Sequence, residues 1–455
     1  MSASPTPRRR IVPLLAAALV RSAAAGGPVA AGAPATLAIA ELDAVRVNVD
    51  VGVPGPSAGD RAVFRAPVTI GEGNGDGGTV YGVTTTVRMP SDAAPDGLAV
   101  TMVAYDLGAG STIVLAGVDP RPAGVEPPAG TELRRTILGG TGRFSGARGV
   151  LATTVGADGT WSNAMTLLGV GDAVTRTFTV RAPVAPAARA TGPAEPLAAG
   201  ALITDWFPIV AGATRGRGAA TLTGVSDAVV DGDPFRLALC LVALDLGGGD
   251  RLHLAGLTPI AAGAPGPRRP TMPLAVIGGT GRFAGARGED VVTFTPTGSI
   301  HAIRLVGRGA PEGSLGAGSA VALATVDNDP TEIELGGGSG TSLGDLWTWT
   351  SRTEEDGMVD GSSVGLLTNV AVERSGTTRL GLAFYLRPEG DLVVASLDAY
   401  PAPGAPITVG SRRVRAIVGG TGETLGAAGT VAMERAGDDR FDYVFALVTP
   451  ATAGE

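Results

Sequence analysis

GGTGRFSGARG, at residues 139–149, recurs as GGTGRFAGARG at residues 278–288 and as GGTGETLGAAG at residues 419–429. The copies start 139 and then 141 residues apart. A solenoid would repeat roughly every 20–50 residues. The longer spacing instead indicates a whole domain copied in tandem, because a unit of that length can bury a core of its own.

The residues after the motif argue against a nucleotide-binding loop. A dinucleotide-binding turn also places glycines after an apolar strand, but a helix must follow so that its N-terminus meets the pyrophosphate. Here β-branched runs follow, at residues 150–155 and 291–295, and such runs favour strands. We therefore expect a strand, a glycine-rich corner with positive φ or close backbone approach, and a second strand.

Composition points to an all-β chain. Of 455 residues, 44% are apolar, while 71 are Gly and 33 are Pro, which suits short strands joined by many turns. No apolar run is long enough for a transmembrane helix. In the first copy, alternating segments predict eight strands, at residues 44–51, 62–70, 79–89, 98–107, 111–117, 133–138, 150–155 and 160–168.

Eight strands without a helical period predict an antiparallel barrel, which removes exposed sheet edges. The expected architecture is therefore three tandem eight-stranded antiparallel β-barrels. The expected domains are a leader at residues 1–34, barrels at 35–171 and 172–308, a linker at 309–319 and a third barrel at 320–450.

Charge and rare residues exclude several functions. The net charge is −8 and all basic residues are Arg, which excludes a lysine Schiff base and disfavours a nucleic-acid partner. The one cysteine, Cys240, lies in an apolar run and predicts a buried small side chain. With only His253 and His301 besides, we expect no metal site and little material for Ser-His-Asp catalysis. No cofactor is expected.

The N-terminus resembles a secretory signal. Three arginines at residues 8–10 precede an apolar stretch at 11–20 and a segment of small residues. Arg21 interrupts that pattern, so a disordered or organelle-targeting leader is the alternative. We expect secretion to the extracellular space and no membrane anchor.

The order of short signals in each copy resembles the plant dirigent family. In the first copy these signals are GD at 59–60, VYG at 80–82, GSTIVLAG at 110–117, DP at 119–120 and ILGGTGRFSGARG at 137–149. The resemblance implies a barrel of the allene-oxide-cyclase type, an apoplastic location and oligomerisation. It also implies a dirigent activity, in which phenolic radicals made by a separate laccase or peroxidase are steered into stereoselective coupling, as from monolignols to lignans.

Such coupling needs no oxidative centre in the guiding protein. It needs an apolar cavity that presents one face of an aromatic radical, which is a task of proximity and orientation. Where the reaction passes through a quinone methide, a carboxylic acid or arginine can donate to the carbonyl oxygen as charge shifts there.

The resemblance places an acid of the pocket at the end of one strand. Asp119 matches it in the first copy and Asp398 in the third, whereas the second copy has Thr258 and so loses the acid. Without the resemblance, Asp119 before Pro120 could equally be a turn former.

The resemblance also implies an arginine shortly before the motif and a second acid on the first strand. Arg413 matches the arginine in the third copy. In the first copy Arg134 is the candidate, but Arg135 stays open because a one-residue step reverses the face of a strand. Asp50 matches the second acid in the first copy, and Asp327 and Asp329 are the candidates in the third. The arginines inside the motif are expected to be structural.

Three barrels in one chain predict an intramolecular pseudo-threefold trimer, because single-barrel relatives are expected to form trimers and tethering supplies about millimolar effective concentration. A homo-oligomer of whole chains is the alternative. Two functional alternatives also remain. One is a non-catalytic extracellular protein that binds phenolics or glycans, and the other is an isomerase like allene oxide cyclase, which would need a long narrow tunnel.

Overall fold

The computed structural model describes residues 35–448, except for 42–43, 53, 72–76, 93–95, 122–123, 158–159, 171–173, 184–188, 192–197, 231–232, 262–270, 296, 307–319, 336–340 and 403–404. The predicted leader and linker lie outside the described residues. Within them, no helix has the length and apolar character needed to cross a membrane.

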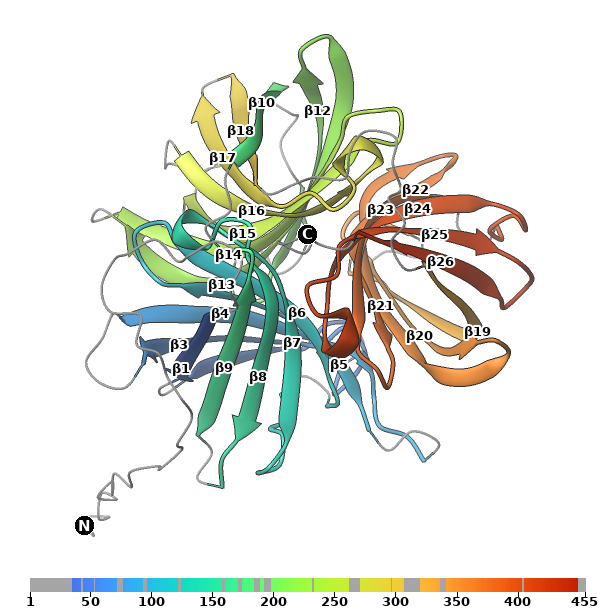
Figure 1. Cartoon of the computed structure of the whole chain (residues 1–455), viewed down its shortest axis with the longest axis horizontal. Helices are drawn as coiled ribbons and strands as arrows, with labels where there is room; N and C mark the ends of the chain where they lie inside the picture. The colour runs from blue at the N-terminus through green and yellow to red at the C-terminus, as the bar shows by residue number, and fades with distance from the viewer. Residues whose placement is uncertain are drawn as a thin grey trace, which may run out of the picture.

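The chain forms three closed eight-stranded antiparallel β-barrels in tandem, which confirms the predicted fold class (Figure 1). Barrel 1 contains β1 (Ala35–Glu41), β2 (Val45–Val49), β3 (Arg61–Ile70), β4 (Gly77–Arg88), β5 (Leu98–Asp106), β6 (Thr112–Asp119), β7 (Glu132–Gly140), β8 (Arg148–Val155) and β9 (Trp161–Leu168). Barrel 2 contains β10 (Val174–Pro183), β11 (Arg189–Thr191), β12 (Leu202–Ala211), β13 (Thr214–Val230), β14 (Asp233–Asp245), β15 (Arg251–Ala261), β16 (Thr271–Thr280), β17 (Gly288–Thr295) and β18 (Gly298–Val306). Barrel 3 contains β19 (Ala320–Ile333), β20 (Leu346–Glu355), β21 (Met358–Glu373), β22 (Gly376–Leu386), β23 (Leu392–Pro401), β24 (Arg412–Gly420), β25 (Gly429–Arg435) and β26 (Phe441–Leu447).

The first strand of barrel 1 differs from the prediction. β1 and β2 pair with opposite ends of β3, so together they occupy one strand position of the barrel, and β1 also pairs with β9 to close it. In barrel 3 one strand, β19, fills that position with a register shift in its middle. β1 was not predicted because its alanines have little intrinsic preference for strands.

The repeated motif forms the expected corner between two strands. In barrel 1, β7 ends at Gly140, a single 3₁₀ turn covers Gly142–Phe144, and β8 starts at Arg148. The fourth residue of the motif is a glycine in every copy. Its φ is +56° at Gly142 in barrel 1, +59° in barrel 2 and +56° in barrel 3. Glycine adopts this conformation without steric cost.

The three corners meet at the centre of the molecule, where β7, β16 and β24 contact one another (Figure 1). A register shift just before each motif turns one extra residue outward. These residues are Leu138, Ile277 and Val418, all fully buried in an apolar core shared by the three barrels. Each barrel therefore packs a core inside itself and contributes its outer face to a second, central core.

Two of the motif arginines, Arg148 and Arg287, tie barrels 1 and 2 together, which confirms the structural role expected of these two. Arg148 donates to the carbonyl oxygens of Ile277 at 2.8 Å and Ala286 at 3.1 Å in barrel 2. Arg287 donates back to Gly146 at 3.2 Å and Gly169 at 3.3 Å in barrel 1. Burial lowers the pKa of Arg148 to about 9, so its guanidinium stays charged at neutral pH and its hydrogen bonds are charge-assisted.

Candidate functional site

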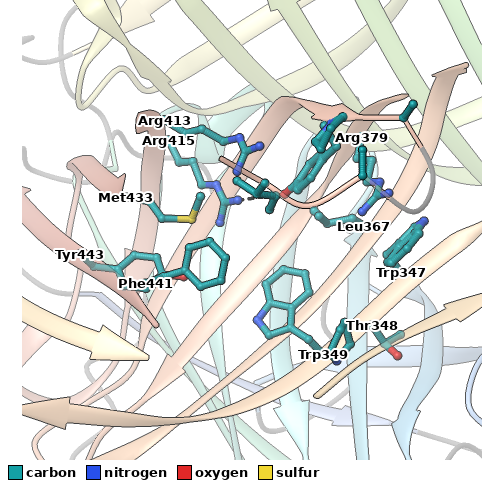
Figure 2. Close-up of a pocket in the computed structure, with 16 residues that line it drawn as sticks. Trp347, Thr348, Trp349, Leu367, Arg379, Arg413, Arg415, Met433, Phe441 and Tyr443 are labelled. Atoms are coloured by element: carbon teal, nitrogen blue, oxygen red, sulfur yellow. Dashed lines mark hydrogen bonds between the residues drawn. The ribbon is translucent and has the colours of Figure 1, made fainter. Parts of the chain in front are cut away.

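Barrel 3 contains a cavity of about 210 Å³ at one end (Figure 2). Among the described residues, its lining combines aromatic rings with three arginines and includes no carboxylate. The aromatic residues are Trp347, Trp349, Tyr400, Phe441 and Tyr443, and the arginines are Arg379, Arg413 and Arg415. A cavity of this composition attracts a flat ligand that carries negative charge.

Strand alternation explains how these side chains reach the cavity. Successive side chains of a strand point to opposite faces, so residues two apart share a face. Trp347 and Trp349 on β20 therefore both face inward, and so do Arg413 and Arg415 on β24. Figure 2 shows the two arginines extending from β24 toward the space above the ring of Trp349.

A buried ion pair supports one wall. Arg415 donates from Nε to Asp398 at 2.6 Å and from an Nη atom to the hydroxyl of Tyr400 at 3.0 Å. Asp398 is not among the lining residues but lies behind Arg415, with Arg251 of barrel 2 at 3.8 Å. Although burial opposes the charged form, Asp398 and nearby tyrosines raise the pKa of Arg415. Burial raises the pKa of the Tyr400 phenol, so this hydroxyl is neutral.

A second arginine is held by stacking. The guanidinium carbon of Arg379 lies 3.7 Å from the ring centroid of Trp347 and 4.3 Å from that of Tyr400. Its Nε donates to Asn369 at 3.1 Å, which fixes the plane of the group. Burial lowers the pKa of Arg379 to about 10, so the side chain remains cationic at neutral pH.

Two buried donors at this cavity lack a protein partner. They are Nη1 of Arg413 and Nε1 of Trp347, both of which belong to lining residues. Arg413 otherwise donates to the carbonyl of Ala399 at 3.1 Å and lies 4.4 Å from the ring of Tyr400. An unsatisfied buried donor is costly, and neither atom is exposed to the cavity, so the two donors do not mark a ligand position.

Barrel 1 repeats the ion pair but surrounds it with polar side chains. Asp119 is fully buried and accepts from Arg135 at 2.8 Å and from Thr101 at 2.8 Å. Burial alone would raise the pKa of Asp119, but Arg135, Arg121 and Thr101 outweigh it and hold the pKa below its usual value. The carboxylate is therefore ionised, and its hydrogen bonds to Arg135 and Thr101 hold it in place.

Two predicted residues of barrel 1 lie elsewhere. Arg134 is exposed on the outer face, and Arg135 takes the inward position beside Asp119. Asp50 is exposed in the loop after β2 and accepts from the backbone N–H of Gly55 at 2.9 Å. It closes a turn and does not face the barrel interior.

The acid that the first strand does supply is Glu41, which sequence reasoning missed. Its carboxylate accepts from the hydroxyl of Tyr105 at 2.7 Å and from the amide of Asn163 at 3.1 Å. Burial raises the pKa of Glu41, against the opposing effect of these hydrogen bonds and of Arg135. The unpredicted β1 placed this residue outside the expected strand.

Among the described residues of barrel 2, no equivalent ion pair occurs. Thr258 is buried at the register position of Asp119 and Asp398, as the sequence predicted. Cys240 is buried inside the barrel and burial raises the pKa of its thiol to about 12, which confirms its predicted packing role. Among the described residues, no cluster of three or more metal-ligating side chains occurs.

Two of the predicted site residues, Arg413 and Asp398, lie at the same end of barrel 3. Arg415, which lines the cavity and binds Asp398, separates that acid from the cavity. Sequence reasoning missed Arg379, Arg415 and both cavity tryptophans. The spacing of Trp347 and Trp349 could have predicted the aromatic wall, because two residues of a strand that are separated by one other residue share a face.

Comparisons with known proteins add little. No family model matches the chain, and no curated protein matches it. Among solved structures the chain is similar to pyocyanin demethylase, at 21% identity and a TM-score of 0.25, over 29% of this chain and 100% of that chain. A likeness at that level carries no functional argument, and the dirigent resemblance stays a prediction.

Proposed function

We propose that barrel 3 binds one small aromatic molecule bearing an acidic or anionic oxygen, and that the chain acts in the manner of a dirigent protein by holding a phenoxy radical while it couples. The observation that carries the proposal is the lining of the cavity, whose described residues include five aromatic rings and three arginines but no carboxylate. Secretion and a separate oxidase are part of the same proposal.

The size of the cavity sets the ligand. An apolar protein cavity of about 150 Å³ takes up benzene, and the cavity of barrel 3 measures about 210 Å³. It therefore suits one substituted ring. A radical held against the aromatic wall has one face covered, so its partner must approach from the open face.

Charge sets the orientation. The guanidinium groups of Arg413 and Arg379 line the cavity and favour a phenolate or carboxylate oxygen. The buried Arg415 is already engaged by Asp398 and Tyr400. The ligand oxygen is therefore expected at Arg413, with the ring over Trp349.

The test is oxidative coupling of coniferyl alcohol by a laccase, with and without the full chain, followed by chiral chromatography. The matched variants are Arg413→Gln and Arg412→Gln, because Arg412 is exposed on the opposite face of the same strand. An enantiomeric excess with wild type and Arg412→Gln that falls with Arg413→Gln supports the proposal. A racemic product from every sample contradicts the coupling activity for this phenol.

A non-catalytic phenolic-binding protein is the second candidate. It is favoured by the cavity size, since coupling needs two rings and about 210 Å³ accommodates one. Quenching of tryptophan fluorescence by a phenol distinguishes the two, because Trp347 and Trp349 line the cavity. Saturable quenching with a racemic coupling product would favour binding alone. The small cavity does not favour a fatty-acid isomerase, which needs a long tunnel.

A further inference from the structure

Three polar side chains form a hydrogen-bonded line inside barrel 2. Ser299 and His301 lie two residues apart on β18 and face the interior, and Asp290 lies on the neighbouring strand β17. The hydroxyl of Ser299 is 3.3 Å from Nε2 of His301, and Nδ1 of His301 is 2.6 Å from a carboxylate oxygen of Asp290.

The acid determines which way the protons point. A carboxylate only accepts hydrogen bonds, so the short contact to Asp290 places the imidazole proton on Nδ1. In the neutral imidazole, Nε2 then carries the lone pair and accepts a hydrogen bond from the hydroxyl of Ser299. Asp290 and His301 are 0% and 4% exposed, whereas Ser299 is partly exposed and can meet a substrate. This is the arrangement of an activated serine.

The other barrels show that the fold does not need these residues. Asp290 follows the last motif glycine by two residues, and the matching positions of barrels 1 and 3 hold Leu151 and Val431, both 0% exposed in apolar cores. A buried carboxylate is costly where an apolar side chain serves as well. Its presence in barrel 2 alone, paired with histidine, therefore calls for a role other than folding.

Ser299 lies near one end of barrel 2. The cross-strand registers place Ser299 where barrel 3 has Phe441, a residue of the cavity lining, and where barrel 1 has Trp161. Barrel 2 therefore has a small serine where barrel 3 has a large aromatic ring. This position lies at the end of the barrel that contains the cavity in barrel 3. The strand partners of Ser299 are Ala182 and Phe294, which are apolar.

We propose that barrel 2 contains an acyl-transfer site that hydrolyses small esters, with Ser299 as nucleophile, His301 as general base and Asp290 as the residue that positions His301. Ser299 Oγ attacks the ester carbonyl carbon while its proton passes to Nε2 of His301. The tetrahedral intermediate expels the alcohol, which takes that proton. Water then attacks the acyl-serine, again through His301, and releases the acid and free Ser299.

This proposal is independent of the aromatic site in barrel 3 and revises the expectation that two histidines are too few for Ser-His-Asp chemistry. One histidine is enough when the fold aligns it. Asp290 and His301 are eleven residues apart and lie on the paired strands β17 and β18, and this pairing brings their side chains together.

The test uses the full chain with two probes, p-nitrophenyl acetate for turnover and a fluorophosphonate for covalent labelling, the labelled peptide being identified by mass spectrometry. We expect labelling at Ser299. Ser299→Ala and His301→Gln should each lower the protein-dependent hydrolysis rate by about 100-fold. Ser162→Ala is the matched control, because Ser162 is exposed on the outer face of the equivalent strand of barrel 1.

Asp290→Leu separates positioning from folding. The leucine that barrel 1 has at this position leaves the Nδ1–H of buried His301 without its acceptor, so the midpoint of thermal unfolding should fall. Labelling is therefore measured well below that midpoint, where its rate should fall by about 100-fold. Hydrolysis by wild type at the rate of Ser299→Ala overturns the proposal. So does labelling confined to residues other than Ser299, or an Asp290→Leu protein that labels as fast as wild type.

Discussion

The first glycine of each motif lies where adjacent barrels meet, and replacing it by alanine tests the central packing. An added Cβ would lie 3.0 Å from Ala275 Cβ at Gly139, 2.7 Å from Val418 Cγ1 at Gly278 and 2.2 Å from Thr136 Cγ2 at Gly419. All three contacts cross from one barrel to the next. The expected cost therefore rises from Gly139→Ala through Gly278→Ala to Gly419→Ala.

The magnitude follows from two opposing effects. Overpacking a tight core costs about 1–3 kcal/mol, while Gly→Ala at a compatible backbone gains about 0.4–1 kcal/mol by restricting the unfolded chain. Thr136 is β-branched and buried, so it cannot rotate away at Gly419. We expect a net loss of about 1–2 kcal/mol for Gly419→Ala and a change near zero for Gly139→Ala.

The assay is urea unfolding followed by fluorescence, with Gly437→Ala as control because its added Cβ approaches another atom only at 3.9 Å. The control should be as stable as wild type or slightly more stable. If Gly419→Ala unfolds at the same urea concentration as Gly437→Ala, the glycines are not required by contacts between barrels. A reversed order among the three variants would refute the packing argument equally.

Three further predictions concern single side chains. Asp119→Asn leaves buried Arg135 without its counter-charge and should lower the free energy of unfolding by about 3–5 kcal/mol in urea. Because the folded-state pKa of Asp119 is lowered, its contribution to the free energy of unfolding is present above the unfolded pKa of about 3.9 and is lost as pH falls through the folded value. Acid unfolding should show that loss in wild type and not in Asp119→Asn. Arg148→Met should cost about 1–3 kcal/mol and speed amide exchange where barrels 1 and 2 meet, whereas unchanged exchange would contradict its bridging role. Trp349→Ala should weaken phenol binding by about two- to tenfold in a fluorescence titration, and unaltered affinity would place the ligand elsewhere.

The tandem barrels and the glycine corner were predictable because both are local. Alternation and turn residues mark the strands, and β-branched runs after the motif exclude a helix. β1 was not predicted because its alternation is carried by alanines, and Glu41 was lost with it.

The inward arginine of barrel 1 could not be settled by counting. An extra residue, Leu138, interrupts the register between β6 and β7 just before the glycines. A bulge changes the face on which the preceding residues lie relative to the motif. Arg134 and Arg135 were therefore equivalent in sequence, and only the three-dimensional pairing with Asp119 distinguishes them.

The line of Ser299, His301 and Asp290 depends on pairing across strands, which one sequence does not reveal. The signal available was a difference between copies, since Asp290 replaces an apolar residue at a fixed distance from the motif. Aligning the three copies position by position would have identified it. Differences among repeats are thus more informative about sites than the shared motif, which serves folding.

Covalent tandem linkage frees the barrels from having to be identical. In a trimer of separate chains, one substitution alters three interiors at once, and every pocket is filled with equal affinity. Here the interior of each barrel has its own chemistry: a closed polar network, a serine–histidine–aspartate line, and an aromatic cationic cavity. A calorimetric titration with an aromatic anion should accordingly saturate at one molecule per chain, and a product formed in one barrel would be released beside the next.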